Sequence, residues 1–175
     1  MPKLMEVKLL KDRLISEDTD EARDLYSQSR FGEIVEGKVE LSFYEALYLL
    51  EKKKINIVDY RKSKLTSHAL TKKAQKNKHD FLTKYTVFKD MRNRGYIVKT
   101  ALKFGADFRV YDRGVKPGED HAKWVLFPVH EGNTLTWHDF AAKNRVAHST
   151  RKKLLICCVD DEGDTTYWEI SWKRP

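Results

Sequence analysis

The sequence predicts an α+β N-terminal domain over residues 1–81 and a mixed α/β domain over residues 82–175, with a central mixed sheet flanked by helices. Three observations support this. A chain of 175 residues is long enough for one domain or two small ones. A hydrophobic content of 41% with 11% aromatic residues is enough to build a core. Near residue 80 the pattern changes to the order helix, three strands, helix, two strands, which is typical of a compact α/β domain.

The first part of the chain alternates between short strands and a short helix. Residues 5–16 alternate loosely between apolar and polar side chains, which predicts a strand and a turn. The stretch SEDTDEARDLYSQSR begins with helix-capping residues, and we expect Ser16 or Asp18 to be the cap. Residues 31–42 contain glycines that separate two short strands.

The next three elements complete the predicted N-terminal domain. SFYEALYLLEKKK is the clearest helix, because Ser42 can cap it and Glu45 stands three residues later, as in a capping box. A short strand over residues 55–60 follows. The stretch over residues 68–81 then predicts a strongly basic helix.

The predicted C-terminal domain begins with an amphipathic helix that ends at Gly95, a typical C-terminal cap. Thr136 is the expected cap of a second helix, and the acids and glycine of DDEGD suit a hairpin turn. In chain order, three glycine-terminated strands, the second helix and the hairpin cover residues 96–105, 106–114, 122–132, 136–150 and 154–172.

The net charge of +8 is concentrated in the middle of the chain. Residues 61–103 carry 13 basic and two acidic side chains, whereas residues 1–60 carry 10 and 13, and residues 104–175 carry 11 of each. A block of cations is either a solvated face or a surface that binds phosphates. The basic balance of the whole chain favours a nucleic-acid partner.

Several classes of protein do not fit the sequence. Cys157 and Cys158 are adjacent in an apolar run, where neighbouring strand residues point to opposite faces, so we expect no disulfide between them. No residue spacing resembles a metal site, and we expect neither a metal nor a cofactor. No apolar run approaches the roughly 20 residues of a membrane span, and no signal peptide is visible. We therefore expect a soluble cytoplasmic protein without a membrane partner.

A few residues in the second half could carry chemistry. His121 lies in the Gly/Pro-rich loop GVKPGEDHAKW directly before a strand, where sites are often built. Tyr111 ends the strand FRVY, so its hydroxyl could face the same loop, although partial burial is the commoner fate of a tyrosine. Lys152 and Lys153 stand between a helix and a strand, where lysines also serve solubility. His148 sits at a helix end, where a cation favours the helix dipole.

These residue types predict one kind of phosphoryl chemistry better than another. Metal-dependent cleavage needs two or more converging acids, and Asp107 has no visible partner acid. A tyrosine, a histidine and a lysine can instead activate a ribose 2′-hydroxyl, protonate the departing 5′-oxygen and stabilise the charge that develops on phosphorus. Only RNA has the hydroxyl that this chemistry needs.

Three separate motifs resemble the catalytic domain of the archaeal tRNA-splicing endonucleases. They are GYIVKTALKFGADFRVYDRG, HAKWVLFPV and RVAHSTRKKLLICCVDDEGDTTYWEISW, which agree with that family in order and spacing over about residues 84–172. The preceding helix and the N-terminal part, with SFYEALYLL followed by a short strand, also resemble the family's catalytic-type subunits.

The resemblance implies a function and a role for each of three residues. Tyr111 would be the general base on the 2′-hydroxyl, His121 the general acid on the leaving 5′-oxygen, and Lys152 the cation that stabilises the transition state. The enzyme would be a metal-independent endoribonuclease that excises introns from precursor tRNA at bulge-helix-bulge junctions. Its products would carry 2′,3′-cyclic phosphate and 5′-hydroxyl ends.

The resemblance also implies how RNA and other subunits are bound. The family holds a bulged base between two flat side chains, for which Arg145 and Trp168 match, with Tyr167 as the alternative to Trp168. The acidic turn that includes Asp160, Asp161 and Asp164 would insert into a basic pocket of a neighbouring subunit. A homotetramer is expected, with a heterotetramer as the alternative, because cutting two junctions requires two active sites at a fixed separation.

Two other hypotheses remain open from sequence. One is a non-catalytic RNA-binding or structural subunit of such an assembly. The other is a metal-dependent DNA nuclease on a related α/β fold. The presence of Tyr111, His121 and Lys152 together argues against the non-catalytic subunit, and the lack of a partner acid for Asp107 argues against the metal-dependent nuclease.

Overall fold

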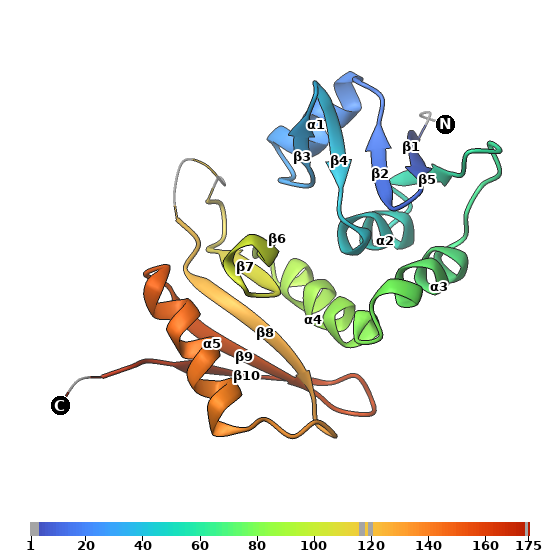
Figure 1. Cartoon of the computed structure of the whole chain (residues 1–175). Helices are drawn as coiled ribbons and strands as arrows, with labels where there is room; N and C mark the ends of the chain where they lie inside the picture. Colours follow the sequence, from blue (N-terminus) through green and yellow to red (C-terminus); the bar gives the residue numbers. More distant parts are fainter. Residues whose placement is uncertain (1–3, 116–117, 119–120, 174) are drawn as a thin grey trace. The chain divides into compact units, whose positions relative to one another are not determined.

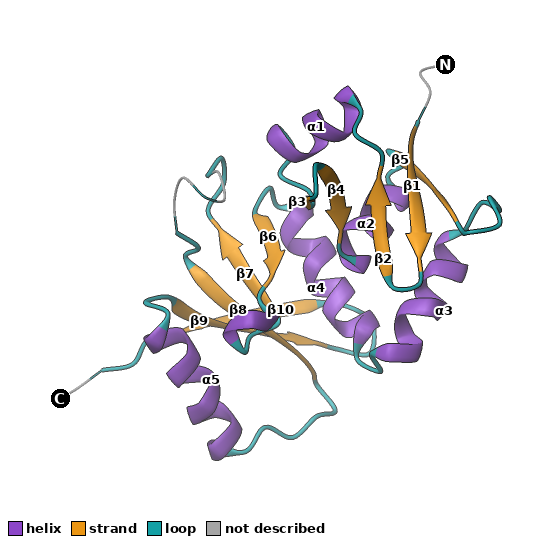
Figure 2. Ribbon diagram, turned by 45° about the horizontal axis from the view of Figure 1, so that its top comes forward, coloured by secondary structure: helices purple, strands orange, loops and turns teal. Residues whose placement is uncertain are grey.

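The structure is a computed structural model that describes residues 4–115, 118, 121–173 and 175. The chain divides into two compact units, Met1–Phe81 and Leu82–Pro175. Each unit has its own five-stranded sheet and its own helices (Figure 1, Figure 2). The predicted fold class is confirmed: an α+β unit precedes a unit in which helices flank a mixed sheet.

The N-terminal unit contains a sheet in the order β3-β4-β2-β1-β5. Strand β1 pairs with β2 antiparallel and with β5 parallel, while β4 joins β2 to β3 through antiparallel pairs. The elements are β1 (Met5–Leu10), β2 (Arg13–Ser16), α1 (Asp20–Ser27), β3 (Glu33–Val35), β4 (Lys38–Leu41), α2 (Phe43–Glu51), β5 (Ile55–Val58) and α3 (Ser67–Asn77).

Helix α2 is central to the core of this unit and has the predicted capping box. The Ser42 side chain accepts from the backbone N–H of Glu45, and the Glu45 carboxylate accepts from the backbone N–H of Ser42. Glu45 is buried, and its second oxygen accepts from the N–H of Gly32 at 2.9 Å. One carboxylate thus ties the loop at Gly32 to the start of the helix.

The predicted cap of α1 was wrong. Thr19 has the extended backbone of an N-cap, and its side chain accepts from the N–H of Ala22. Ser16 instead ends strand β2 and donates to the carbonyl of Val39, while Asp18 forms a bidentate pair with Arg23. Ser16 and Asp18 therefore have other partners, and the cap falls on Thr19.

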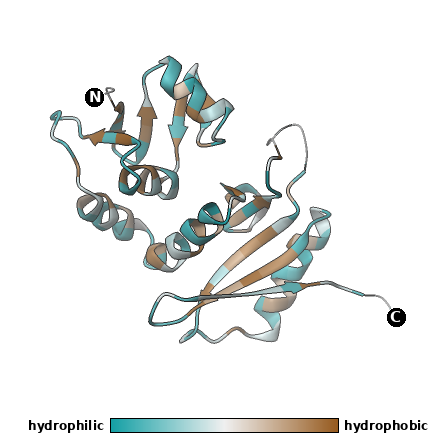
Figure 3. Ribbon diagram, turned by 180° about the vertical axis from the view of Figure 1, so that it is seen from behind, coloured by the Kyte–Doolittle hydropathy of each residue, from teal (hydrophilic) through white to brown (hydrophobic). Residues whose placement is uncertain are grey.

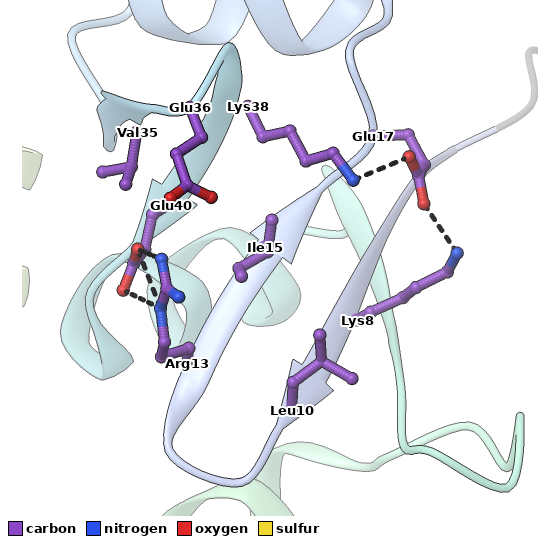
Figure 4. Close-up of a pocket in the computed structure, with 9 residues that line it drawn as sticks. All are labelled: Lys8, Leu10, Arg13, Ile15, Glu17, Val35, Glu36, Lys38 and Glu40. Atoms are coloured by element: carbon purple, nitrogen blue, oxygen red, sulfur yellow. Dashed lines mark hydrogen bonds and ion pairs between the residues drawn. The ribbon is translucent and has the colours of Figure 1, made fainter.

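The solvent face of the N-terminal sheet is charged but paired. A shallow hollow on this face is crossed by ion pairs from Lys8 to Glu17 at 2.7 Å, Lys38 to Glu17 at 3.5 Å and Arg13 to Glu40 at 2.7 Å (Figure 4). These three cations are thus compensated by Glu40 of β4 and by Glu17, which follows β2.

The C-terminal unit contains a sheet in the order β10-β9-β8-β7-β6. Strands β8 and β9 are parallel, and every other neighbouring pair in this sheet is antiparallel. The elements are α4 (Phe81–Asn93), which spans the boundary between the units, β6 (Ile97–Thr100), the 3-10 helix η1 (Leu102–Phe104), β7 (Phe108–Tyr111), β8 (Trp124–His130), α5 (Trp137–Ser149), β9 (Lys153–Val159) and β10 (Thr165–Ile170).

Helices α4 and α5 cover opposite faces of this sheet. On one face, Ala147 and Val146 of α5 pack with a core cluster that includes Phe127 and Ile156. On the other, the ring of Phe88 in α4 lies 5.9 Å from that of Phe108. Figure 3 shows largely hydrophobic strands in this sheet, whereas α5 mixes hydrophilic and hydrophobic residues. Strands buried on both faces explain the nearly continuous apolar runs in the sequence.

The strand predicted over residues 96–105 is shorter than expected. Strand β6 ends at Thr100, and η1 follows, closed by Gly105 in the left-handed conformation with a φ of 73°. Helix α4 ends at Asn93, and Gly95 adopts a φ of 89°, which confirms it as the residue that terminates the helix.

Candidate active site

The sheet topology brings Tyr111 and His121 to the same end of adjacent strands. Strand β7 ends at Tyr111 and is antiparallel to β8, with Val110 opposite Trp124. The end of β7 therefore lies beside the start of β8, and the backbone N–H of Lys123 donates to the carbonyl of Val110 at 2.9 Å. His121 precedes Trp124, the first residue of β8, by three residues. It therefore lies at the end of the sheet where β7 ends at Tyr111.

Lys152 reaches that same end of the sheet from the next strand. Strand β9 runs parallel to β8, with Lys153 opposite Trp124, and the N–H of Lys153 donates to the carbonyl of Lys123 at 3.0 Å. Lys152 directly precedes β9. The three predicted catalytic residues are thus located at one end of three neighbouring strands, although they come from positions 41 residues apart in the sequence.

Tyr111 is buried, and its surroundings link it to His121. Only 5% of Tyr111 is exposed, and it belongs to a small apolar cluster with Ile97 and Ala122. Because Ala122 is part of this cluster, the adjacent His121 is held near the strand end while its own side chain is exposed. The guanidinium carbon of Arg109, two residues before Tyr111 on β7, lies 5.9 Å from the centre of the Tyr111 ring.

The end of helix α5 determines the position of Lys152. Thr150 is the C-cap, and Arg151 follows in the left-handed conformation with a φ of 56°. The N–H of Arg151 donates to the carbonyl of His148, and the N–H of Lys152 donates to that of Ala147, which is the Schellman pattern. The half-buried Lys152 side chain also donates from Nζ to the carbonyl of Thr150 at 2.9 Å.

Lys153 has a different set of contacts. Its ammonium lies 2.6 Å from Oε1 of Glu169 on β10, and Oε2 of Glu169 accepts from the indole N–H of Trp124 at 2.7 Å. The hydrogen bond from Lys153, together with that from Trp124, holds the pKa of Glu169 below its usual value. Lys153 therefore joins the starts of β8 and β9 to the end of β10.

The two aromatic residues considered for base stacking lie on opposite faces of β10. The hydroxyl of Tyr167 donates to Oδ2 of Asp90 in α4 at 2.7 Å, and burial raises the pKa of this phenol. Trp168 lies opposite Ile156, on the face that α5 covers, and is 50% exposed. Of the two, Trp168 has the side chain that is available to a base.

Arg145 and His148 belong to the last turns of α5. Arg145 is exposed, and His148 is three residues further along, on the same side of the helix. The ring of His148 lies 4.7 Å from that of Trp172, beyond the end of β10. His148 thus packs against an aromatic residue at the end of a helix.

The acidic turn lies at the other end of β9. Asp160 stabilises the turn itself, because its Oδ1 accepts from the N–H of Asp164 at 2.7 Å. Asp161 has a side chain that is 80% exposed, and its Oδ1 lies 3.2 Å from Nε2 of His130. Asp164 is exposed as well. Asp160 thus stabilises the turn, while Asp161 and Asp164 form an acidic surface exposed to solvent.

Part of the loop before His121 is outside the residues that the structure describes. Glu119 and Asp120, which adjoin His121 in the sequence, are among them. Within the described part of the chain, no group of three or more histidine, cysteine, aspartate or glutamate side chains could hold a metal ion. No helix among the same residues is long and apolar enough to cross a membrane.

Sequence reasoning missed Arg109 and Trp172. Arg109 shares a face of β7 with Tyr111, and period-two alternation along FRVY is the signal that could have found it. Trp172 follows β10 and contacts His148, and nothing in the sequence indicates that contact.

Comparison with known proteins identifies the class first. Residues 5–71 match the model of the tRNA intron endonuclease N-terminal domain, and residues 81–167 match that of the tRNA intron endonuclease catalytic C-terminal domain. The two matches fall on the α+β unit and on the mixed-sheet unit with the candidate site. They define an endonuclease architecture with a separate N-terminal domain.

Relatives similar over the whole chain agree with this class. Proteins named tRNA-splicing endonuclease are 42% identical in Thermococcus onnurineus and 37% identical in Pyrococcus furiosus, each over 174 residues and 99% of both chains. The Nanoarchaeum equitans protein of that name is 46% identical over 142 residues, which cover 78% of this chain and 90% of that one. The chain belongs to the tRNA intron endonuclease family, and the resemblance seen in its motifs is confirmed.

Proposed function

We propose that the chain is the catalytic subunit of a tRNA-splicing endonuclease, which cuts precursor tRNA at bulge-helix-bulge junctions without a metal. Family membership supports an endonuclease of tRNA intron excision. The observation that carries the finer proposal is the location of Tyr111, His121 and Lys152 at one end of three adjacent strands.

The proposed reaction is an internal transfer of the phosphodiester. Tyr111, as the phenolate, accepts the proton of the ribose 2′-hydroxyl, and the 2′-oxygen forms a bond to phosphorus while the bond to the 5′-oxygen breaks. His121 gives its proton to that 5′-oxygen, and Lys152 stabilises the negative charge of the transition state. The products are a 2′,3′-cyclic phosphate and a 5′-hydroxyl, and the proton balance closes through these side chains alone.

The surroundings of Tyr111 support its proposed role as base. A general base must carry the negative charge of a phenolate at some point in the reaction, and a nearby cation favours that form. The Arg109 guanidinium beside the ring supplies such a charge. His121 is exposed at the end of its loop, which leaves it accessible to a large substrate.

RNA binding and assembly complete the proposal. Arg145 and Trp168, both exposed, hold a bulged base between a guanidinium and an indole. The acidic turn of Asp160, Asp161 and Asp164 contacts a basic pocket on a second copy of the chain, and four copies form the enzyme. In the alternative assembly, a different structural subunit takes the place of two copies.

Single-turnover cleavage of a bulge-helix-bulge RNA tests the function. His121→Ala is expected to slow cleavage by about 10²- to 10⁴-fold, the usual contribution of a general acid. An unchanged rate contradicts the assignment of the acid. If the wild-type chain binds this RNA but never cuts it, alone or with added partner subunits, the chain is a non-catalytic subunit.

A further inference from the structure

The N-terminal unit carries a strongly basic segment that the proposed catalytic residues do not use. Residues 61–78, called the basic segment below, contain seven lysine or arginine side chains and no acid. The segment comprises a tight turn and helix α3, which Thr66 caps through a hydrogen bond from the N–H of Ala69.

The lysines of α3 are separated from its buried side. Leu70 and Ala74, one turn apart, are 0% and 4% exposed and hold the helix against the unit. Lys72, Lys73 and Lys76 are all exposed and lie on the remaining surface of the helix. Four helical residues span about 6 Å along the axis, so Lys72 and Lys76 form a short row of positive charge.

Among the residues that the structure describes, these charges have no compensating acid, unlike those of several cations elsewhere in the chain. Cations on the sheet of the same unit pair with glutamates (Figure 4), and Lys123 and Lys153 pair with acids in the C-terminal unit. Within the described part of the chain, Lys72, Lys73 and Lys76 have no ion pair.

Like charges placed four residues apart on a helix destabilise it by a few tenths of a kcal/mol. A surface that serves solubility alone is better built with both signs interspersed. The basic segment has a single sign, which fits a surface whose partner supplies the negative charge.

The turn before α3 adds an observation that points to nucleic acid. Tyr60 is 73% exposed, and the guanidinium carbon of Arg61 lies 5.1 Å from the centre of its ring. Oδ1 of Asp59 accepts from the N–H of Arg61 and of Ser63, which orders the turn. An exposed aromatic beside unpaired cations is typical of surfaces that contact RNA bases and phosphates together.

We infer that the basic segment binds the phosphate backbone of the substrate RNA, as a second contact surface on the N-terminal unit. This inference rests on the proposed function for the identity of the RNA. The charge favours a polyanion, and the outer side of α3 presents lysines rather than the apolar residues that a membrane surface requires. The segment contributes to binding and takes no part in the cleavage step.

The test compares two triple variants that remove the same charge. K72Q/K73Q/K76Q removes the α3 row, while K52Q/K53Q/K54Q removes three exposed lysines that follow α2 in the same unit. Glutamine keeps a high helix propensity, so α3 should remain folded, and circular dichroism checks this. Affinity for the precursor RNA is measured over a range of salt concentrations, and the cleavage rate at saturating RNA.

The α3 variant should bind the RNA at least about tenfold more weakly at low salt. Its plot of log affinity against log salt should be shallower by about 2 to 3, because each lost phosphate contact removes about 0.7 to 0.9 from the slope. Its rate at saturating RNA should stay within about twofold of the wild type, and the control variant should keep the wild-type affinity and slope.

Other outcomes overturn the inference, and they are separate from failure of the proposed function. Unchanged affinity and slope, or equal losses in both variants, would show that the α3 row is not a specific contact. A change in particle mass without a change in affinity would make it a protein interface. If the wild type fails to cut RNA but the α3 variant alone loses affinity, the proposed function fails and this inference stands.

Discussion

The neighbouring residues Lys152 and Lys153 have different surroundings, and this difference determines what each can do. Lys153 is bound to Glu169 within the strand layer, whereas Lys152 stands at the end of α5, with its ammonium on a backbone carbonyl. A lysine that is to approach a phosphate must exchange its contact for the substrate. Breaking the contact of Lys152 with the Thr150 carbonyl costs less than breaking the direct ion pair between Lys153 and Glu169.

We therefore predict opposite results for two alanine substitutions. Lys152→Ala should lower the single-turnover rate by about 10²- to 10³-fold, the usual effect of removing one group that stabilises a developing charge. Lys153→Ala should leave the rate at saturating RNA within a few fold and should lower stability slightly. Equal losses of rate in the two variants would contradict the role proposed for Lys152.

The faces of β10 lead to a second prediction. Trp168→Ala should weaken RNA binding by about 5- to 150-fold, because stacking of one base contributes about 1–3 kcal/mol. Its melting temperature should change little, since the side chain is half exposed. Tyr167→Phe removes the hydrogen bond to Asp90 and should lower the free energy of unfolding by about 1–3 kcal/mol while RNA affinity stays the same. The reverse pattern would assign the stacking role to Tyr167.

At the scale of elements, Glu169 links three strands at the end of the sheet that carries the candidate site. The pKa of Glu169 is held below its usual value by Lys153 and Trp124, so the folded state favours the ionised carboxylate. Its contribution to stability is complete above the ordinary value of 4.5 and is lost as the pH falls through the lower folded pKa.

A pH series of urea unfolding curves tests this link. Glu169→Gln should be less stable than the wild type near neutral pH, and the difference should shrink as the pH falls below about 4.5. Glu162→Gln, in the exposed turn at the other end of β9, is the control and should follow the wild type throughout. A difference between Glu169→Gln and wild type that stays constant down to about pH 3 would contradict the proposed linkage.

The sequence predicted an element well where the residues that stabilise it are close together in the chain. The capping boxes at Ser42 and Thr136 involve residues three positions apart, so they are visible in the sequence. The cap at Thr19 was missed because Ser16 and Asp18 are equally good caps by residue type. In the structure, Ser16 is bound to a strand distant in the sequence and Asp18 to Arg23, so neither caps the helix. The early end of β6 was not predicted. The residues that follow it are mostly apolar, and such a run fits a longer strand as well as the 3-10 helix that forms there.

The candidate site could be predicted only in part. Residue types and the loop position indicated Tyr111 and His121, but the different surroundings of Lys152 and Lys153 depend on the Schellman turn at Arg151. That turn uses an arginine in a conformation where glycine is usual, so the sequence gives no signal for it. The family resemblance supplied the choice of Lys152. The sequence could not distinguish the roles of Tyr167 and Trp168, because the hydrogen bond that occupies Tyr167 is made to Asp90 on helix α4.

At the scale of the whole molecule, the proposed assembly predicts a particle mass. The purified protein should have a mass about four times the chain mass of 20.6 kDa. The double substitution Asp161→Asn and Asp164→Asn should reduce it to about half, because both acids face outward. Asp160 is left intact, since it orders the turn. A wild-type monomer or dimer would contradict the homotetramer and would favour an assembly with a different subunit.

The most direct test of the proposed chemistry is the identity of the ends that cleavage produces. The wild-type protein is incubated with a bulge-helix-bulge RNA in the presence of a chelator, and mass spectrometry identifies the termini. The proposed roles of Tyr111, His121 and Lys152 predict 2′,3′-cyclic phosphate and 5′-hydroxyl ends, with no cleavage where the scissile ribose is replaced by 2′-deoxyribose. Loss of activity with the chelator, or cleavage of the deoxy substrate to a 5′-phosphate, would contradict the proposed mechanism.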